Sequence, residues 1–210
     1  MKRATIFLTL LLPISLLLGL GFVINGRIQA KPQMVDVGGS ITTDTIWTVA
    51  NSPYIITETV TVEAGVILTV EAGVTVMTSG DMGQYLDVKG HLEVIGTAVN
   101  PILFTAFDDL STNRWSGIAV SGSANFDYIT MRYAYTALFM SESSGGDVLL
   151  ENSLFEENSV YPIVVDTDAL HRLKMNNVIF NNNVPNRVGI NRSGSAGDIL
   201  ELAGNVLLTP

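Results

Sequence analysis

The stretch that decides the fold runs from Thr59 to Met77 and reads TVTVEAGVILTVEAGVTVM. It states one pattern twice, because the tripeptide Glu-Ala-Gly interrupts an apolar alternation at 63–65 and again at 71–73. Alternation with a period of two is typical of a strand with one buried face. A glycine after each strand predicts a tight corner, since glycine bends there without a steric penalty. The residues expected to point inward are Val60, Val62, Val66, Leu68, Val70, Val74 and Val76.

Strands and corners that leave no room for a helix predict a chain wound into a β-solenoid. Aligning the chain with itself gives the period: residues 126–131 match 150–155 at an offset of 24, and these match 175–180 at an offset of 25. A second set, 138–140, 163–165 and 188–190, repeats every 25 residues. Both periods fall within the roughly 20–45 residues of known solenoid repeats. We expect about six coils, stacked at the spacing of neighbouring strands.

Asparagines recur at the predicted corners of the later coils. Asn152 aligns with Asn177, and Asn158 aligns with Asn183. Asparagine tolerates the left-handed backbone that a corner needs, and its amide can hydrogen-bond a stacked copy of itself. The sequence therefore predicts two asparagine ladders.

Residues 1–30 have the composition of an export signal. Lys2 and Arg3 precede an apolar run from Ala4 to Ile24, and Ile28-Gln29-Ala30 is similar to a cleavage site. A cleaved signal peptide is favoured over an uncleaved membrane anchor, although the run is about as long as the ~20 residues that span a bilayer. Both readings predict a secreted or cell-surface protein. Residues 31–40 are expected to be a linker or the approach to the first coil, and 41–210 the β-helix domain.

The charge of the chain excludes some partners. Of its 11 basic residues three lie within 1–30, where there is no acidic residue, so the remainder carries eight basic and 20 acidic residues, a net charge of −12. An acidic domain of this kind argues against nucleic acid and against an anionic membrane surface as ligands. Contact with a membrane is expected only through residues 1–30, if they are not cleaved. The absence of cysteine excludes disulfides in spite of the predicted export.

Three phrases carry a resemblance to a known family: the repeat in Thr59–Met77, the segment GTAVNPILFT at 96–105, and WSGI at 115–118. In these phrases the sequence resembles right-handed parallel β-helix proteins of the pectin-lyase-like type, which occur among bacterial secreted and surface proteins. The resemblance spans about Ile41–Leu208 and implies an all-β, single-stranded parallel β-helix. The family includes polysaccharide lyases, hydrolases and adhesins, so the resemblance implies a fold and not one activity.

Polar residues at outward positions give only a thin set of candidates for a site. They are Asp87, Lys89, Ser116, Ser121, Asp166, Asp168, Arg187, Asn191 and Arg192. Asp166 and Arg192 are about one coil apart and form the best constellation, but a scattered, solvated polar face is the favoured interpretation. We therefore assign no catalytic or cofactor-binding residue from the sequence.

Calcium is the one cofactor that the sequence suggests, and the supporting pattern is weak. Asp166-Thr167-Asp168 and Asp108-Asp109 lack the glycine and the spaced third acid of a dedicated calcium loop, so no metal ligand is assigned. His91 and His171 are interpreted as ordinary surface or edge residues. The chain has no P-loop, zinc or G-x-S-x-G motif.

Three functional hypotheses follow. The first is an exported, non-catalytic β-helix that acts as a structural or carbohydrate-binding module of the cell surface or envelope, with polysaccharide or other envelope components as its partners. The second is a polysaccharide lyase or glycoside hydrolase with its site around Asp166 and Arg192. The third is a subunit that stacks end to end through an uncapped C-terminal end at 197–210, where apolar core and strand edges would be exposed.

Overall fold

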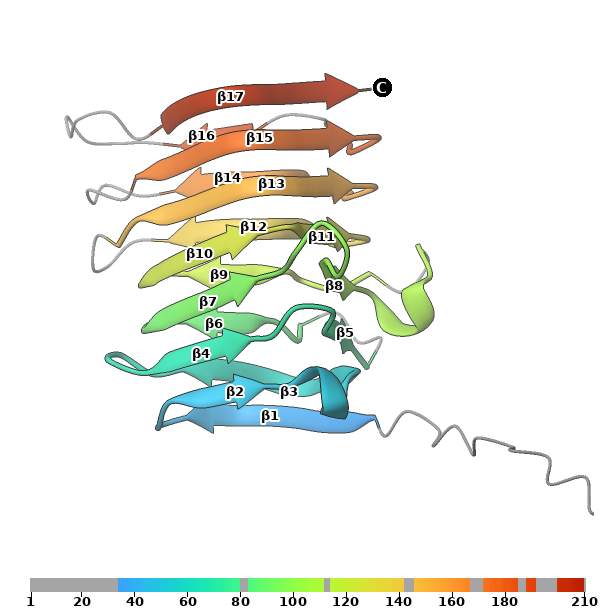
Figure 1. Cartoon of the computed structure of the whole chain (residues 1–210), viewed down its shortest axis with the longest axis vertical. Coiled ribbons are helices and arrows are strands. Elements are labelled where there is room, and N and C mark those ends of the chain that lie inside the picture. Colours follow the sequence, from blue (N-terminus) through green and yellow to red (C-terminus); the bar gives the residue numbers. More distant parts are fainter. Residues whose placement is uncertain are drawn as a thin grey trace, which may run out of the picture. The chain divides into compact units, whose positions relative to one another are not determined.

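The computed structural model describes residues 34–79, 83–111, 114–141, 146–166, 172–184, 188–191 and 200–209, and for 141, 166, 188, 190, 191 and 200–209 it describes the backbone. Residues 32–210 form one compact unit. In the described ranges, seventeen strands, all paired in parallel, wind as a β-solenoid. The chain rises coil by coil, with front strands running right and rear strands left, which is a right-handed path (Figure 1).

Each coil contributes strands to three faces. Face 1 is formed by the second halves of β1 (Val35–Ile41) and β3 (Tyr54–Val62), then by β6 (Leu86–Val88), β9 (Ile118–Val120), β12 (Thr136–Ser141), β14 (Tyr161–Asp166) and β16 (Val188–Asn191). Face 2 is formed by β2 (Thr45–Trp47), β4 (Ile67–Val70), β7 (His91–Ile95), β10 (Ser123–Asp127) and the first halves of β13 (Val148–Glu156), β15 (Leu173–Asn181) and β17 (Leu200–Thr209).

Face 3 completes the coil. It holds the first halves of β1 and β3, then β5 (Thr75–Thr78), β8 (Ile102–Thr105), β11 (Ile129–Arg132) and the second halves of β13, β15 and β17. Among the described residues the helical segments are two 3₁₀ turns, η1 (Val49–Asn51) and η2 (Phe107–Asp109). The predicted parallel β-solenoid is confirmed.

The first strand begins earlier than the sequence indicates. β1 starts at Val35 and pairs with β3 over most of its length, so 35–40 belong to the solenoid and do not form a linker. Within β1, Gly39 takes a left-handed φ of 77° at the point where the register of the pairing with β3 shifts. This shift is a β-bulge, a position in a strand where glycine is common.

The repeated Glu-Ala-Gly tripeptides form the corners that the sequence predicts. Gly65 and Gly73 have φ values of 80° and 82°. After each corner a backbone amide turns back to close it: Val66 donates to the Glu63 carbonyl at 3.0 Å and Val74 to the Glu71 carbonyl at 3.2 Å. The seven residues expected to point inward from this stretch are all buried.

The apolar side chains stack in columns inside the coil. On face 3, Val76, Phe104, Met131, Phe155 and Phe180 follow one another in register, each at most 1% exposed. Phe155 and Phe180 lie 5.4 Å apart between ring centroids. Trp47 and Tyr54 stack with their ring centroids 4.9 Å apart, and both are buried core residues.

The register predicted from the self-alignment is confirmed residue by residue. Phe126 pairs with Leu150, and Leu150 with Met175. On face 1 the predicted neighbours Leu138, Ile163 and Val188 are paired in that order. The period measured in the sequence therefore is the spacing of vertical neighbours in the structure.

Both asparagine ladders form, but the asparagines of only one ladder have the predicted left-handed backbone conformation. Asn152 and Asn177 are left-handed, with φ of 45° and 55°, and the Asn177 amide donates to Asn152 Oδ1 at 2.8 Å. Asn158 donates to Asn183 Oδ1 at 2.8 Å, yet the left-handed residues at that corner are the preceding Glu157 and Asn182. Asn158 and Asn183 point inward, where they are buried and satisfy backbone groups.

Candidate functional site

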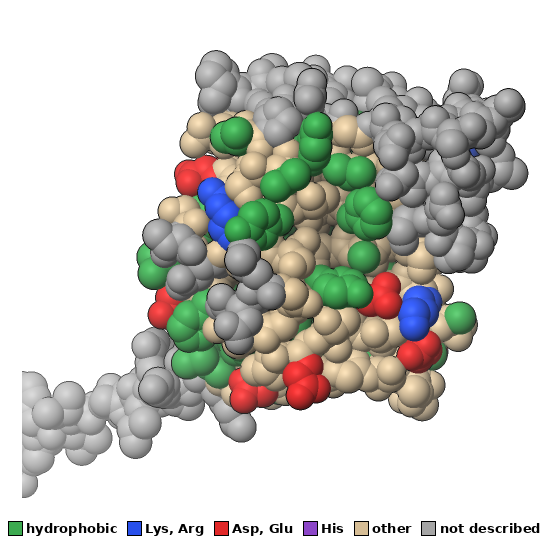
Figure 2. Space-filling view, turned by 180° about the vertical axis from the view of Figure 1, so that it is seen from behind, with side chains coloured by type: hydrophobic (Ala, Val, Ile, Leu, Met, Phe, Trp, Pro, Cys, Tyr) green, Lys and Arg blue, Asp and Glu red, His purple; other side chains and the backbone are tan. Residues whose placement is uncertain are grey.

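Face 1 carries an open hollow of about 380 Å³ across β6, β9 and β12. Figure 2 views this side of the molecule and shows hydrophobic side chains around a depression, with acidic and basic side chains beside it. The hollow is lined by Tyr85, Asp87, Ser116, Ile118, Ala119, Thr136 and Phe139. These residues are distant in the sequence and come from three successive coils.

Strand pairing explains why the surface is hollow at this point. Asp87 pairs with Ala119, and Ala119 pairs with Phe139, so the three outward side chains form a column across three strands. The methyl group of Ala119 is the smallest of the three and forms the floor. The longer side chains of Asp87 and Phe139 stand on either side of it.

A small charge network borders the hollow at Asp87. Lys89 Nζ lies 3.9 Å from Asp87 Oδ2 and 3.7 Å from Glu63 Oε2. Burial raises the pKa of the Asp87 carboxyl above its ordinary value of 3.8; the Lys89 ammonium opposes this rise and the Glu63 carboxylate adds to it. The site therefore holds an acid that is less readily ionised than an exposed aspartate.

Two hydroxyl groups and two aromatic rings complete the lining. Ser116 Oγ accepts a hydrogen bond from the Gly83 amide at 3.2 Å, which leaves its own O–H able to donate. Thr136 adds a second hydroxyl, and Tyr85 and Phe139 are half-buried rings. A mainly apolar surface with a few polar groups is typical of a small-molecule site.

Some of the predicted candidates meet in this hollow. The structure brings Asp87, Lys89 and Ser116 to the same side of face 1. Ser121 does not belong to the hollow: it follows β9 at the next corner, and its Oγ donates to the Val88 carbonyl at 3.4 Å. The sequence named Asp87 and Ser116 of this lining, but not Thr136 or the aromatic Tyr85 and Phe139.

The constellation of Asp166 and Arg192 cannot be placed. Asp166 ends β14, where its backbone pairs with Ser141 and Asn191. The side chains of Asp166 and Asn191, and residues Asp168, Arg187 and Arg192, lie outside the described part of the chain, as do His171 and residues 1–30. The hypotheses that rest on them stay predictions.

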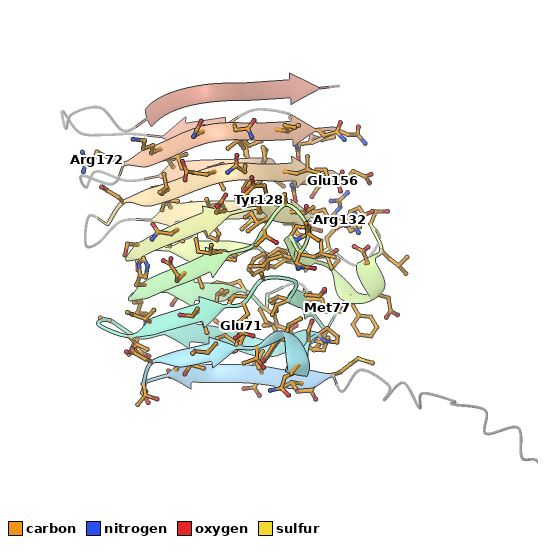
Figure 3. All side chains as sticks on the ribbon, viewed as in Figure 1. Glu71, Met77, Tyr128, Arg132, Glu156 and Arg172 are labelled. Atoms are coloured by element: carbon orange, nitrogen blue, oxygen red, sulfur yellow. The ribbon has the colours of Figure 1, made fainter. Side chains whose placement is uncertain are left out.

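Asp109, one of the two acids at the weaker calcium candidate, has protein partners instead. The Arg132 guanidinium binds its carboxylate through two nitrogens, with Nε to Oδ1 at 2.7 Å, and Thr105 Oγ1 donates to the same oxygen. Arg132 also holds Glu156 at 3.1 Å, and Figure 3 shows these two side chains at neighbouring positions. Asp109 thus fastens η2 to the coil above it. Within the described ranges no group of three His, Cys, Asp or Glu side chains is arranged to hold a metal.

Comparison with known families identifies the fold. A family model described as a pectate-lyase-like β-helix domain matches residues 39–153, which is 115 of the 210 residues. The chain belongs to this family. No curated protein and no solved structure matches it. The family accounts for the solenoid and leaves the activity of this β-helix domain open.

One polar cluster of the β-helix domain was missed by sequence reasoning. His91 was interpreted as an ordinary surface residue, but its ring lies between Ser123 and Glu93, at 2.7 and 2.9 Å. His91 and Glu93 are two apart on one strand, which is a signal that they share a face. Ser123 is 32 residues further on, because the longer segment through η2 lies in that coil, and a 25-residue period could not align them.

None of the helical segments in the described residues of the β-helix domain has the length and hydrophobicity needed to cross a membrane.

Proposed function

We propose that this β-helix domain binds a neutral carbohydrate in the hollow on face 1, as an exported module of the cell surface or envelope. The observation that carries the proposal is that two aromatic rings, a carboxyl group and two hydroxyl groups border one open hollow of about 380 Å³. Sugars present both apolar C–H faces and hydroxyl groups, so they match a surface of this composition.

Each part of the lining has a role in such binding. The rings of Tyr85 and Phe139 offer rigid apolar surface to the face of a sugar ring, at a low entropic cost. Asp87 accepts hydrogen bonds from sugar hydroxyls, and Ser116 and Thr136 can both donate and accept. Because Ala119 leaves the floor low, a ligand can contact side chains from three coils at once.

Charge favours a neutral ligand. Residues 31–210 carry a net charge of −12, Asp87 lines the hollow, and Lys89 connects Asp87 to a second acid, Glu63. The nearby cation, Lys89, is paired with these two acids. An anionic polysaccharide would be repelled unless cations bridged it to the surface.

The lining favours binding over cleavage of a glycosidic bond. Hydrolysis of that bond generally uses two carboxyl groups, one on each side of it. Among the described residues that line the hollow, Asp87 is the one that carries a carboxyl group. The alternative, a lyase or hydrolase around Asp166 and Arg192, draws no support from the described side chains.

Affinity electrophoresis and calorimetry against a panel of neutral polysaccharides test the proposal. We expect retardation by at least one member of the panel, such as cellulose derivatives, mannan or β-1,3-glucan, without release of products. Phe139→Ala removes one ring from the hollow and should raise the Kd about tenfold, which corresponds to about 1.4 kcal/mol.

Tyr128→Ala is the matched control. Tyr128 is a half-buried aromatic residue at the corner between faces 2 and 3, away from the hollow, and is labelled in Figure 3. It should leave the affinity unchanged. No binding across the panel, or equal losses in the two variants, would contradict the proposal.

A further inference from the structure

Face 2 carries a second polar cluster, which the glycan-binding proposal does not use. His91 on β7 and Ser123 on β10 are paired directly across neighbouring strands, and His91 Nδ1 lies 2.7 Å from Ser123 Oγ. The other ring nitrogen, Nε2, lies 2.9 Å from Glu93 Oε2. Asn125 Nδ2 donates to the same carboxylate oxygen at 2.8 Å. A hydroxyl, an imidazole and a carboxylate are thus connected in series.

The hydrogen bonds set the tautomer of the ring. Because the Glu93 carboxylate only accepts, the ring proton is assigned to Nε2, and Nδ1 is left to accept from the Ser123 hydroxyl. Asn125 fixes the carboxylate that orients the ring. A nucleophile within hydrogen-bond reach of a base, which a third group orients, is the arrangement that activates serine in acyl transfer.

Space for a substrate lies beside this cluster. A hollow of about 360 Å³ borders Ser123 and His91 at the corner between faces 1 and 2, with Gly65, Gly90, Gly122 and Gly146 in its lining. A Cβ at any of the last three would come within 2.0–2.2 Å of a backbone carbonyl oxygen, so the coils approach closely at this corner. Lys89 also lines this hollow, and its Nζ is paired with Glu63 and Asp87 at 3.7 and 3.9 Å.

We propose that Ser123, His91 and Glu93 form a centre that hydrolyses carboxylic esters with a short acyl group. Ser123 and His91 are the catalytic residues, and Glu93 and Asn125 position them. This activity is independent of glycan binding on face 1.

The reaction balances with water as its only co-substrate. Ser123 Oγ forms a bond to the carbonyl carbon while its proton passes to His91 Nδ1. The bond to the alcohol oxygen then breaks, and His91 returns the proton to that oxygen. Water, deprotonated by His91, adds to the acyl-serine, the bond to Oγ breaks, and the proton returns to Oγ. The products are one carboxylic acid and one alcohol.

Two measurements on the purified full chain test the centre. The first is hydrolysis of 4-nitrophenyl acetate, and the second is covalent labelling by a fluorophosphonate followed by mass spectrometry of the labelled peptide. We expect a single adduct on Ser123, and a rate at least about a hundredfold above that of Ser123→Ala, the usual minimum for a serine–base pair. Glu93→Gln should retain the fold, slow the reaction and change its pH profile, which a merely structural role would not do.

Ser121→Ala is the matched control, since Ser121 lies two residues from Ser123 but hydrogen-bonds a backbone carbonyl. It should keep the wild-type rate and the adduct. The proposal is overturned if the label spreads over several residues or misses Ser123, or if Ser123→Ala hydrolyses the ester as fast as the wild type. Because labelling is read on the wild-type protein, a poorly folded variant does not obscure the result.

Discussion

Asn158 shows how much one side chain contributes at the residue scale. It is 1% exposed and connects three coils: its Oδ1 accepts from the Ala134 amide at 3.0 Å, and its Nδ2 donates to the Met131 carbonyl and to Asn183. Backbone groups buried at a corner need such partners, because no strand continues the ladder there. The corner therefore requires Asn158 to point inward, where its amide group bonds these buried backbone groups.

Replacing Asn158 by alanine should lower the free energy of unfolding by about 3 kcal/mol, because it leaves a buried amide and a buried carbonyl without partners. Urea-induced unfolding measures this change. Asn176→Ala is the control: Asn176 is half-buried, and its side chain donates to the Glu151 carboxylate at 3.1 Å, which is its one hydrogen bond among the described residues, so the substitution should cost less than about 1 kcal/mol. If both variants lose the same free energy of unfolding, the buried Asn158–Asn183 ladder contributes no more to stability than a half-buried side-chain hydrogen bond.

Asp87 gives a prediction about pH. Its pKa is raised in the folded protein, chiefly by burial, so the folded state holds the proton more tightly than the unfolded chain does. Below the ordinary pKa of 3.8 the Asp87 carboxyl is neutral in both the folded and the unfolded state, and its burial costs no charge desolvation. As the pH rises through the raised pKa of the folded state, the carboxyl ionises where it is partly buried, and the protein loses stability. Asp87→Asn removes the titration, so its stability relative to wild type should increase between pH 3 and pH 7.

Urea unfolding of both proteins at the two pH values gives the comparison. Ser116→Ala serves as a control, because it changes the same hollow without removing a titrating group. Its stability relative to wild type should not depend on pH. A relative stability of Asp87→Asn that stays constant or decreases toward neutral pH would mean that the Lys89 ion pair outweighs burial.

At the scale of the element, the corner after β9 depends on having no side chain. A Cβ on Gly122 would lie 2.0 Å from the Gly90 carbonyl oxygen, whereas a Cβ on Gly65 would meet no atom within 4 Å. Gly65 needs glycine for its left-handed φ of 80° instead. Two glycines that look alike in the sequence are therefore required for different reasons, one for space and one for backbone angle.

We expect Gly122→Ala to destabilise the protein by about 3 kcal/mol, since the coils must separate to admit the methyl group. Gly65→Ala should cost about 1 kcal/mol, the penalty of a left-handed alanine. Thermal unfolding of the two variants ranks them. The account of this corner fails if the Gly65 substitution is the more damaging.

Strand pairing could be predicted from the sequence where successive coils have the same length. It could not be predicted next to a coil of different length. The pairing of Leu138, Ile163 and Val188 could be predicted because their coils have equal length, so that the hydrophobic pattern carries the register. The coil through η2 is longer, and the period is lost there. That is why the contact of His91 with Ser123, and the clamp of Arg132 on Asp109, had no signal in the sequence.

For the whole molecule, the repeat determines which distant residues become surface neighbours. Asp87 and Phe139 are 52 positions apart in the sequence, yet they lie in one column with Ala119, because their three strands are paired in succession. Sequence reasoning named Asp87, Lys89 and Ser116 from their polarity. It could not find Phe139, since an outward aromatic residue in an apolar strand looks like part of the core.

The central claim is that successive coils assemble one carbohydrate-binding surface on face 1. The most direct test is an NMR titration of ¹⁵N-labelled protein with a neutral oligosaccharide, such as cellohexaose or mannohexaose, chosen by the electrophoresis panel. The account predicts chemical-shift changes that cluster on the amides of Asp87, Ser116, Ala119, Thr136 and Phe139, from three coils at once. Shifts confined to face 2 or face 3, or no shifts at saturating ligand, would contradict it.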